Sequence, residues 1–200
     1  MKSQSKTPLK IGFDLDGVLL YNPTRTVRPL VAFVKKKILH KKQTKFFYPH
    51  TKFQQAIFRI FHFSSFMTAP GFEIIRDLVA QDKIEAYLIT ARFAYLKKDL
   101  EKWLQKVNGD TIFKAVYYNK RNQQPHVYKA HMIEKLQLDV YMEDNWDIVE
   151  HVSMSKHLEH CRVYWITNLI DRHFIHYPFT FLTLKQALHA LRASIKYSNT

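Results

Sequence analysis

The chain has 200 residues and a mass of 23.9 kDa, which is enough for one sizeable hydrophobic core. Apolar residues make up 46% of it and charged residues 24%, a composition that favours a globular protein over a disordered, collagen-like or disulfide-rich one. The single cysteine, Cys161, excludes an intrachain disulfide, and no apolar stretch is long enough to span a bilayer. The polar first nine residues do not have the pattern of a signal peptide, so we expect a soluble cytoplasmic protein.

The first predicted element is a strand over Ile11–Phe13, which is followed at once by Asp14, Asp16 and Gly17. Side chains two residues apart in a strand point the same way, and the glycine after them indicates a sharp turn. At such a strand end, one carboxylate can bind a hard cation while the other stays available for proton transfer. A calcium loop would need a late Glu and further oxygen ligands, yet no Asp or Glu occurs between Asp16 and Glu73.

The net charge of +14 is concentrated in the segment between Tyr21 and Pro70. This segment carries eight of the fifteen phenylalanines and no carboxylate. It is either an ordinary insert with a Phe core and solvated lysines, or an electropositive lid that recruits an anionic substrate. Its ten cationic residues are Arg25, Arg28, Lys35, Lys36, Lys37, Lys41, Lys42, Lys45, Lys52 and Arg59.

Helical spacing of apolar residues within this segment, at Leu30–Val34 and Phe53–Phe61, predicts two helices. We therefore expect residues 21–70 to form a basic, Phe-rich helical cap. Residues 1–20 and 71–200 are expected to form the catalytic core.

Beyond the turn at Pro70 and Gly71, predicted helices and strands alternate along the chain. This order predicts an α/β protein with a Rossmann-like three-layer α/β/α core and a parallel sheet, to which the small α-helical cap is added. The predicted helices are Phe72–Val79, Phe93–Val107, Lys129–Leu136, a helix through Ile148 and His151, and Leu184–Ile195. The predicted strands after the cap are Ile84–Thr90, Phe113–Tyr118, Val140–Met142 and Arg162–Ile166.

One of these strands ends in residues that can bind an anion, and another ends in residues that can bind a cation. Because ligands of parallel sheets bind outside the carboxyl ends of the strands, these residues are candidates for a common site. One strand ends at Thr90, with Ala91 and Arg92 next to it at a predicted helix start, and offers a hydroxyl and backbone amides to an anion. Another ends at Glu143 and Asp144, which offer carboxylates to a divalent cation.

Two further residues extend this site. Asp147 lies one helical turn after Asp144. Lys129 opens a predicted helix fifteen residues before Asp144, and its ammonium group could neutralise both a phosphate and the acidic cluster.

The ordered set resembles the haloacid dehalogenase (HAD) superfamily of phosphohydrolases, and the resemblance extends from Ile11 to Arg192. The stretch from Ala69–Gly71 to Leu88–Arg92 is similar to the deoxyribonucleotidase-like, 5′-nucleotidase type C-like branch. The residues that carry the superfamily resemblance are Asp14 and Asp16 for the first motif, Thr90 for the second, Lys129 for the third, and Glu143, Asp144 and Asp147 for the fourth.

The resemblance implies a phosphatase that forms an aspartyl-phosphate on Asp14. Asp16 would protonate the leaving oxygen and then activate water. Mg²⁺ would be held by Asp14, the Asp16 carbonyl and Asp144, with Glu143 and Asp147 as indirect contributors.

The same resemblance implies that Thr90 hydrogen-bonds a transferring phosphoryl oxygen, and that Lys129 pairs with the nucleophile Asp14 or with the phosphate. Ala91 and Arg92 would complete the substrate-binding set. The sequence leaves open whether Thr90 only caps a helix, whether Arg92 pairs with an acid instead of substrate, and whether Lys135 replaces Lys129. Histidines are frequent, but neither a cysteine cluster nor an H-E-x-x-H helix supports a zinc site.

Three functional classes follow. The first is a Mg²⁺-dependent phosphatase of a small phosphorylated molecule such as a nucleotide. The second applies the same chemistry to nucleic-acid ends and uses the basic cap as a stacking groove. The third is a protein without enzymatic activity that binds nucleic acid or anionic lipid through the cap. The sequence does not determine the oligomeric state.

Overall fold

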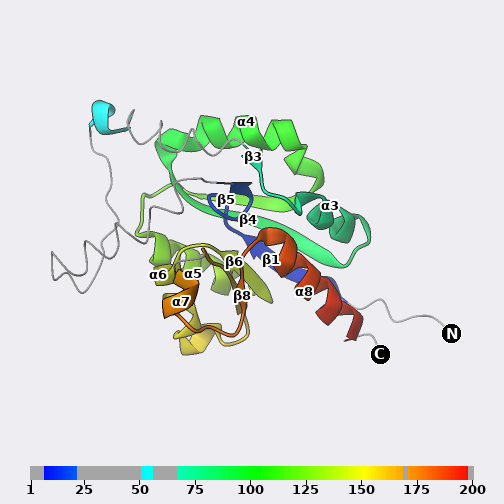
Figure 1. Cartoon of the computed structure of the whole chain (residues 1–200). Helices are drawn as coiled ribbons and strands as arrows, with labels where there is room; N and C mark the ends of the chain where they lie inside the picture. The colour runs from blue at the N-terminus through cyan, green and yellow to red at the C-terminus, as the bar shows by residue number, and fades with distance from the viewer. Residues whose placement is uncertain (1–6, 22–50, 56–66, 169–170, 198–200) are drawn as a thin grey trace.

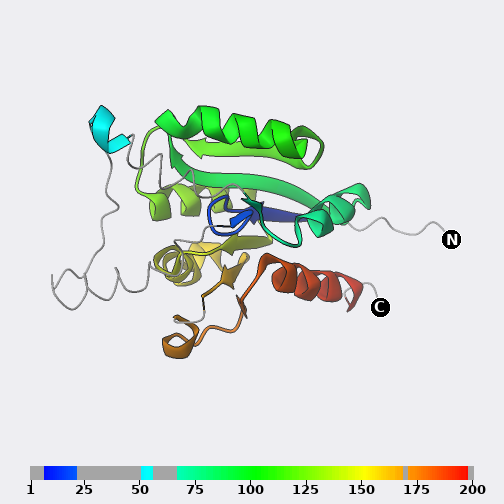
Figure 2. The ribbon, with the colours of Figure 1, turned by 45° about the horizontal axis from the view of Figure 1, so that its top comes forward.

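The computed structural model describes residues 7–21, 51–55, 67–168 and 171–197. In the described part of the chain, six strands form one parallel sheet in the order β5, β4, β1, β6, β7, β8. Figure 2 shows β1 (blue) in the middle of this sheet, between β4 and β6. The strands are β1 (Leu9–Phe13), β4 (Ile84–Phe93), β5 (Phe113–Asn119), β6 (Val140–Glu143), β7 (Arg162–Ile166) and β8 (Thr180–Phe181).

Helices cover both faces of the sheet, and their apolar side chains form two separate cores. The first core contains side chains of α3 (Phe72–Ala80), α4 (Lys97–Val107) and α8 (Leu184–Tyr197), and the second those of α5 (Pro125–Leu136) and α6 (Trp146–Ser153). Shorter helical turns are η2 (Ala94–Leu96), η3 (Gly109–Thr111), η4 (Lys156–Leu158) and α7 (Asp171–Phe174). These layers, seen in Figure 1, confirm the predicted Rossmann-like α/β core. Within the described ranges, no helix has the length and apolarity required to cross a bilayer.

The central strand β1 is packed from both sides because its side chains alternate between the two cores. Ile11 and Phe13 belong to the first core and are fully buried. Gly12 faces the second core, where a Cβ atom would lie 2.5 Å from Leu138 Cδ1 and 2.8 Å from Tyr141 Cδ2. The missing side chain of Gly12 therefore lets the Tyr141 ring approach the backbone of β1 closely.

The structure corrects the predicted boundary between β4 and the following helix. The strand continues past Thr90 to Phe93, and the helix predicted from Phe93 begins at Lys97 after the turn η2. The reason is that β4 keeps pairing with β5: Phe93 is opposite Asn119, after a register shift that follows Thr90. Thr90, Ala91 and Arg92 thus lie within a strand that contains a bulge and not at a helix start.

The helix predicted from Lys129 starts four residues earlier, at Pro125. Proline suits the first helical position because its φ angle is fixed near the helical value and its missing N–H has no helical partner there. Lys129 therefore lies in the second turn of α5. The two-residue strand β8 and the short helix α7 were not predicted.

The ends of the predicted cap pair with each other next to the core. β2 (Leu20–Tyr21) and β3 (Met67–Thr68) form an antiparallel ribbon, and the Ala69 amide donates to the Leu19 carbonyl at 2.8 Å. Further along, the Thr51 hydroxyl accepts from the Gln54 amide, and the Gln54 side chain accepts from the Thr51 amide, as in a helix capping box.

Most of the predicted cap, residues 22–50 and 56–66, lies outside the described residues. This includes the predicted helix around Leu30–Val34, most of the helix predicted over Phe53–Phe61, and nine of the ten cationic residues, Lys52 being the exception. The division of the chain into core and cap therefore stays a prediction.

Cys161 lies in the second core, where burial raises the pKa of its thiol to about 12. Thiolate is the reactive form, so we predict that dithionitrobenzoate modifies the folded protein at least about a hundredfold more slowly than the chain unfolded in guanidinium. The release of thionitrobenzoate at pH 8 measures both rates. Equal rates would show that this part of the core opens readily.

Candidate active site

The candidate site begins where β1 ends at the carboxyl edge of the sheet. The amide of Asp14 still donates to the Met142 carbonyl of β6 at 3.0 Å, so its position is fixed by the sheet. The chain then turns, and the Leu20 amide donates to the Leu15 carbonyl at 2.8 Å. The turn leaves Asp14 only 5% and Asp16 only 8% exposed. Two carboxylates that lie two residues apart in the sequence are therefore both buried.

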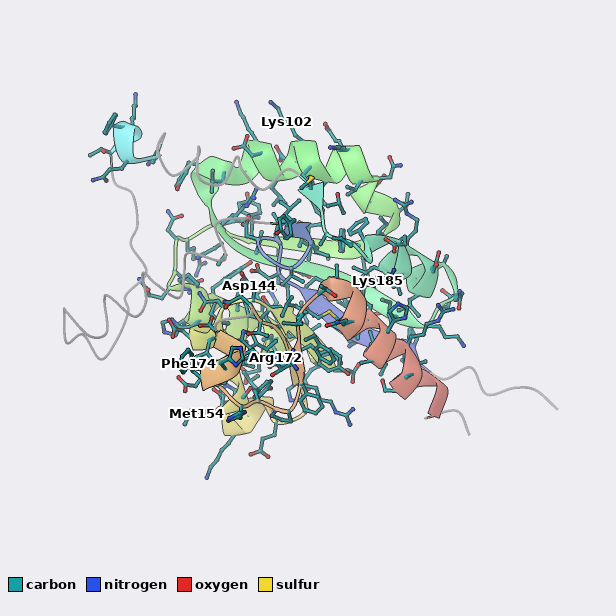
Figure 3. All side chains as sticks on the ribbon, in the orientation of Figure 1. Lys102, Asp144, Met154, Arg172, Phe174 and Lys185 are labelled. Atoms are coloured by element: carbon teal, nitrogen blue, oxygen red, sulfur yellow. The ribbon has the colours of Figure 1, made fainter. Side chains whose placement is uncertain are left out.

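Gly17 allows the turn after β1 to approach the end of β6. Its φ angle is +86°, and a Cβ atom at this position would collide with the Asp144 carboxylate. Asp144 follows β6 and lies in the middle of the molecule in Figure 3. The Trp165 indole N–H donates to the Asp144 carbonyl at 3.2 Å and holds the backbone there. Gly17 is therefore required for the contact as well as for the turn.

Lys129 joins two carboxylates from neighbouring strands. Its Nζ lies 3.0 Å from Asp14 Oδ2 and 2.6 Å from Glu143 Oε2, and its side chain is 3% exposed. Burial lowers the pKa of Lys129, but Asp14 and Glu143 more than offset this and raise the pKa above its ordinary value. The ammonium group is therefore charged at any physiological pH, and the structure places Lys129 and not Lys135, which is exposed, in the site.

Glu143 is fully buried and both of its oxygens accept hydrogen bonds. Oε2 accepts from Lys129 and, at 3.1 Å, from the Tyr141 hydroxyl, while Oε1 accepts from the Asn145 amide at 3.1 Å. Tyr141 was missed by the sequence analysis, although it precedes Glu143 by two residues in β6 and so shares its face. These contacts indicate that Glu143 holds Lys129 in place.

Thr90 and Arg92 reach the site from the bulged end of β4. The Thr90 hydroxyl accepts from the Arg92 amide at 3.2 Å, and the Arg92 guanidinium binds the Asp16 carboxylate through two hydrogen bonds of 2.7 and 2.6 Å. Of the two roles that the sequence left open for Arg92, the structure shows the pairing with an acid. The bond formed by Thr90 is local and does not test its predicted contact with a phosphoryl group.

Three carboxylates of the site could share a metal ion. Asp14, Glu143 and Asp144 each offer an oxygen, and these oxygens lie within 4.8 Å of one another. Burial raises the pKa of Asp14 well above its ordinary value; Lys129 opposes this, and the charges of Glu143 and Asp144 add to it. The ammonium group of Lys129 offsets one of these three negative charges, so a divalent ion with oxygen ligands would balance the other two. The donor set therefore fits Mg²⁺.

Two other residues predicted for the site, Ala91 and Asp147, do not belong to the group of three carboxylates. The side chain of Ala91 packs against the second core. Asp147 is exposed on α6, and its amide donates to the Asn145 side chain that caps this helix. His126 and His151 contact each other edge to face, with ring centroids 4.9 Å apart, and neither belongs to the carboxylate group.

The sequence matches no protein-family model and no curated protein, but solved structures share its fold. A haloacid dehalogenase-like hydrolase from Bacteroides fragilis superposes with a TM-score of 0.55 at 11% identity, over 90% of this chain and 99% of that one. A predicted phosphoglycolate phosphatase from Haemophilus somnus gives 0.53 at 13% identity, over 94% and 99% of the two chains. A protein described as a beta-phosphoglucomutase from Thermotoga maritima gives 0.55 at 14% identity, over 92% and 99%.

The chain has the fold of haloacid dehalogenase-like hydrolases. The expected Rossmann-like arrangement is thereby confirmed at the level of architecture. Identities of this size establish the fold alone. The similarity to the deoxyribonucleotidase-like branch therefore stays a prediction.

Replacing Lys129 tests whether its charge holds the acidic cluster together. We predict that Lys129→Met lowers the free energy of unfolding by roughly 3 kcal/mol or more, because Asp14 and Glu143 lose the buried cation that contacts both. Urea denaturation measures the change. Lys135→Met, at an exposed position of the same helix, is the matched control and should change stability by less than about 0.5 kcal/mol. Equal effects of the two variants would contradict the assignment.

Replacing Gly17 tests the contact between the turn and β6. Gly17→Ala introduces a side chain into the space of the Asp144 carboxylate, so we predict that Mg²⁺ affinity falls about 10- to 100-fold. Isothermal titration calorimetry with MgCl₂ measures the affinity. Gly109→Ala, where the nearest atom belongs to a flexible leucine side chain, is the control and should bind Mg²⁺ like the wild type. Unchanged affinity in Gly17→Ala would show that Asp144 is not a ligand.

Proposed function

We propose that this protein is a Mg²⁺-dependent phosphatase that acts through an aspartyl-phosphate intermediate. The observation that carries the proposal is the position of Asp14: it is buried at the end of the central strand, 3.0 Å from Lys129 and next to Asp144 and Glu143. A carboxylate among other carboxylates is costly to bury, and such perturbed groups concentrate at functional sites. The fold shared with hydrolases of the haloacid dehalogenase type supports the same chemistry.

In the proposed reaction, an oxygen of Asp14 attacks the phosphorus atom of a phosphate monoester. The bond from phosphorus to the ester oxygen breaks, and Asp16, in its protonated form, gives this oxygen a proton. A water molecule then attacks the phosphorus of the aspartyl-phosphate, and Asp16 takes up the proton of that water. The bond from phosphorus to the Asp14 oxygen breaks and inorganic phosphate leaves, so Asp14 is again a carboxylate and Asp16 is again protonated.

Positive charge around Asp14 makes the attack on a phosphate dianion feasible. Lys129 supplies one such charge from the protein, and the hydroxyl of Thr90 is proposed to donate to a phosphoryl oxygen. Held by Asp14, Asp144 and the Asp16 carbonyl, Mg²⁺ would screen the repulsion between nucleophile and substrate.

For the substrate, we propose a phosphorylated small molecule and, within that class, a nucleotide, as the resemblance to the deoxyribonucleotidase-like branch suggests. The basic segment between Tyr21 and Pro70 favours a second candidate, the phosphorylated end of a nucleic acid. A phosphate-release screen with nucleotides, sugar phosphates, lipid phosphates and phosphorylated oligonucleotides, with and without MgCl₂, tests both. Loss of oligonucleotide turnover with rising salt, but not of nucleotide turnover, would favour the second candidate.

Asp14→Asn removes the charge of the nucleophile without changing its size. We predict that this variant loses phosphate release entirely and keeps the melting temperature of the wild type or exceeds it, since one buried charge is removed. Phosphate release and circular dichroism measure the two properties. Turnover comparable to that of the wild type would contradict the mechanism.

The metal assignment is tested by comparing two aspartates that lie three residues apart. Asp144→Ala should raise the Mg²⁺ concentration for half-maximal rate by at least about tenfold, because the ion loses an oxygen ligand. Asp147→Ala, at the exposed position on α6, should change it by less than about twofold. A rate that survives EDTA, or a larger effect of Asp147, would overturn the assignment.

A further inference from the structure

The two aspartates of the turn after β1 are held in different ways. Asp14 receives one ammonium contact, which it shares with Glu143. Asp16 has both oxygens bound by a single guanidinium: Arg92 Nε donates to Oδ2 at 2.7 Å and Nη2 donates to Oδ1 at 2.6 Å. The side chains of Arg92 and Asp16 are 5% and 11% exposed, so little solvent competes with the pair.

The irregular end of β4 is what brings Arg92 to this position. Its pairing with β5 shifts register between Thr90 and Phe93, and the intervening residues form a bulge. A bulge changes the direction of the side chains that it carries, and here it turns Arg92 toward the end of the neighbouring strand β1. The Thr90 hydroxyl, which accepts from the Arg92 amide, fixes the backbone at this point.

The planar guanidinium group of an arginine constrains a carboxylate more strongly than the ammonium group of a lysine does. Two parallel hydrogen bonds fix both the position and the plane of the Asp16 carboxylate, whereas a lysine would fix only a distance. The edge of the guanidinium formed by Nε and Nη2 is also occupied in this pair and cannot bind a phosphoryl group in the same way. Both facts favour a role of Arg92 that is exerted through Asp16.

We propose that Arg92 is a positioning residue, which holds the Asp16 carboxylate in the orientation needed for proton transfer and does not bind the substrate phosphoryl group. This inference rests on the proposed phosphatase function. It replaces the expectation that Arg92 belongs to the substrate-binding set. It also explains the function of the bulge in β4, which is to bring Arg92 to Asp16.

The test is a double-mutant cycle with Arg92→Gln, Asp16→Asn and the double variant, assayed on adenosine 5′-monophosphate and p-nitrophenyl phosphate. Arg92→Gln should lower kcat on the nucleotide about 10- to 100-fold with KM within about twofold, because a misplaced proton donor affects turnover and not binding. The loss on p-nitrophenyl phosphate should be smaller, since nitrophenolate leaves without a proton. In the Asp16→Asn background, Arg92→Gln should cause no further loss.

Two more variants complete the comparison. Arg92→Lys keeps the charge but not the planar guanidinium group, and its kcat should lie closer to that of Arg92→Gln than to that of the wild type. Arg76→Gln, at an exposed position on α3, controls for loss of an arginine and should behave like the wild type. An Arg92→Gln variant that raises KM tenfold in both backgrounds would show direct substrate contact and overturn the proposal.

Thermal melts of the wild type, Arg92→Gln, Asp16→Asn and the double variant give a readout that is independent of activity. Arg92→Gln should lower Tm by roughly 10 °C, because Asp16 stays buried without its partner, and the double variant should recover part of this loss. Additive Tm changes would overturn the proposal whether or not the protein is active. If the wild type hydrolyses none of the phosphates in the screen, the phosphatase function fails, and with it the role of Arg92 in the reaction. An active wild type with additive losses leaves the function standing and refutes the positioning role alone.

Discussion

Lys129 places one buried positive charge between the carboxylates of Asp14 and Glu143, and the arrangement of the site follows from that contact. Each carboxylate ends a different strand of the sheet, so the ammonium group links β1 to β6 through the helix α5. Without this charge, the desolvation of two acids at one point would oppose folding. Tyr141 and the Asn145 amide supply two more donors to Glu143, which therefore accepts three hydrogen bonds.

Two glycines make this concentration of side chains possible. Gly12 lets the Tyr141 ring lie close to β1, which brings its hydroxyl to Glu143, and Gly17 leaves space for Asp144. Gly12 acts on the Glu143 side of the site and Gly17 on the Asp144 side. The acidic cluster thus depends on the absence of side chains at two positions as much as on the acids themselves.

The order of the motifs was predictable because parallel strands place their carboxyl ends along one edge. The structure brings Asp14, Lys129 and Asp144 together as this rule requires. Lys129 lies in the second turn of α5, whereas the sequence predicted it at the start of the helix. The bulge of β4 was not predictable, because it arises from pairing with β5 and leaves no mark in local spacing. The ion pair of Arg92 depends on that bulge. The two-residue strands β2 and β3 are too short for any periodicity to reveal.

The pairing of β2 with β3 affects how well the core tolerates changes in the segment that is inserted between these two strands. The Leu19 carbonyl and the Ala69 amide lie 2.8 Å apart, so the ends of the intervening segment are joined by the core itself. The entropic cost of closing a loop grows only with the logarithm of its length, by about 0.6 kcal/mol for each doubling. Evolution can therefore lengthen, shorten or exchange the segment between these two residues at little expense to the stability of the sheet. The chemistry at the end of β1 and the sequence inserted six residues later are free to diversify at separate rates.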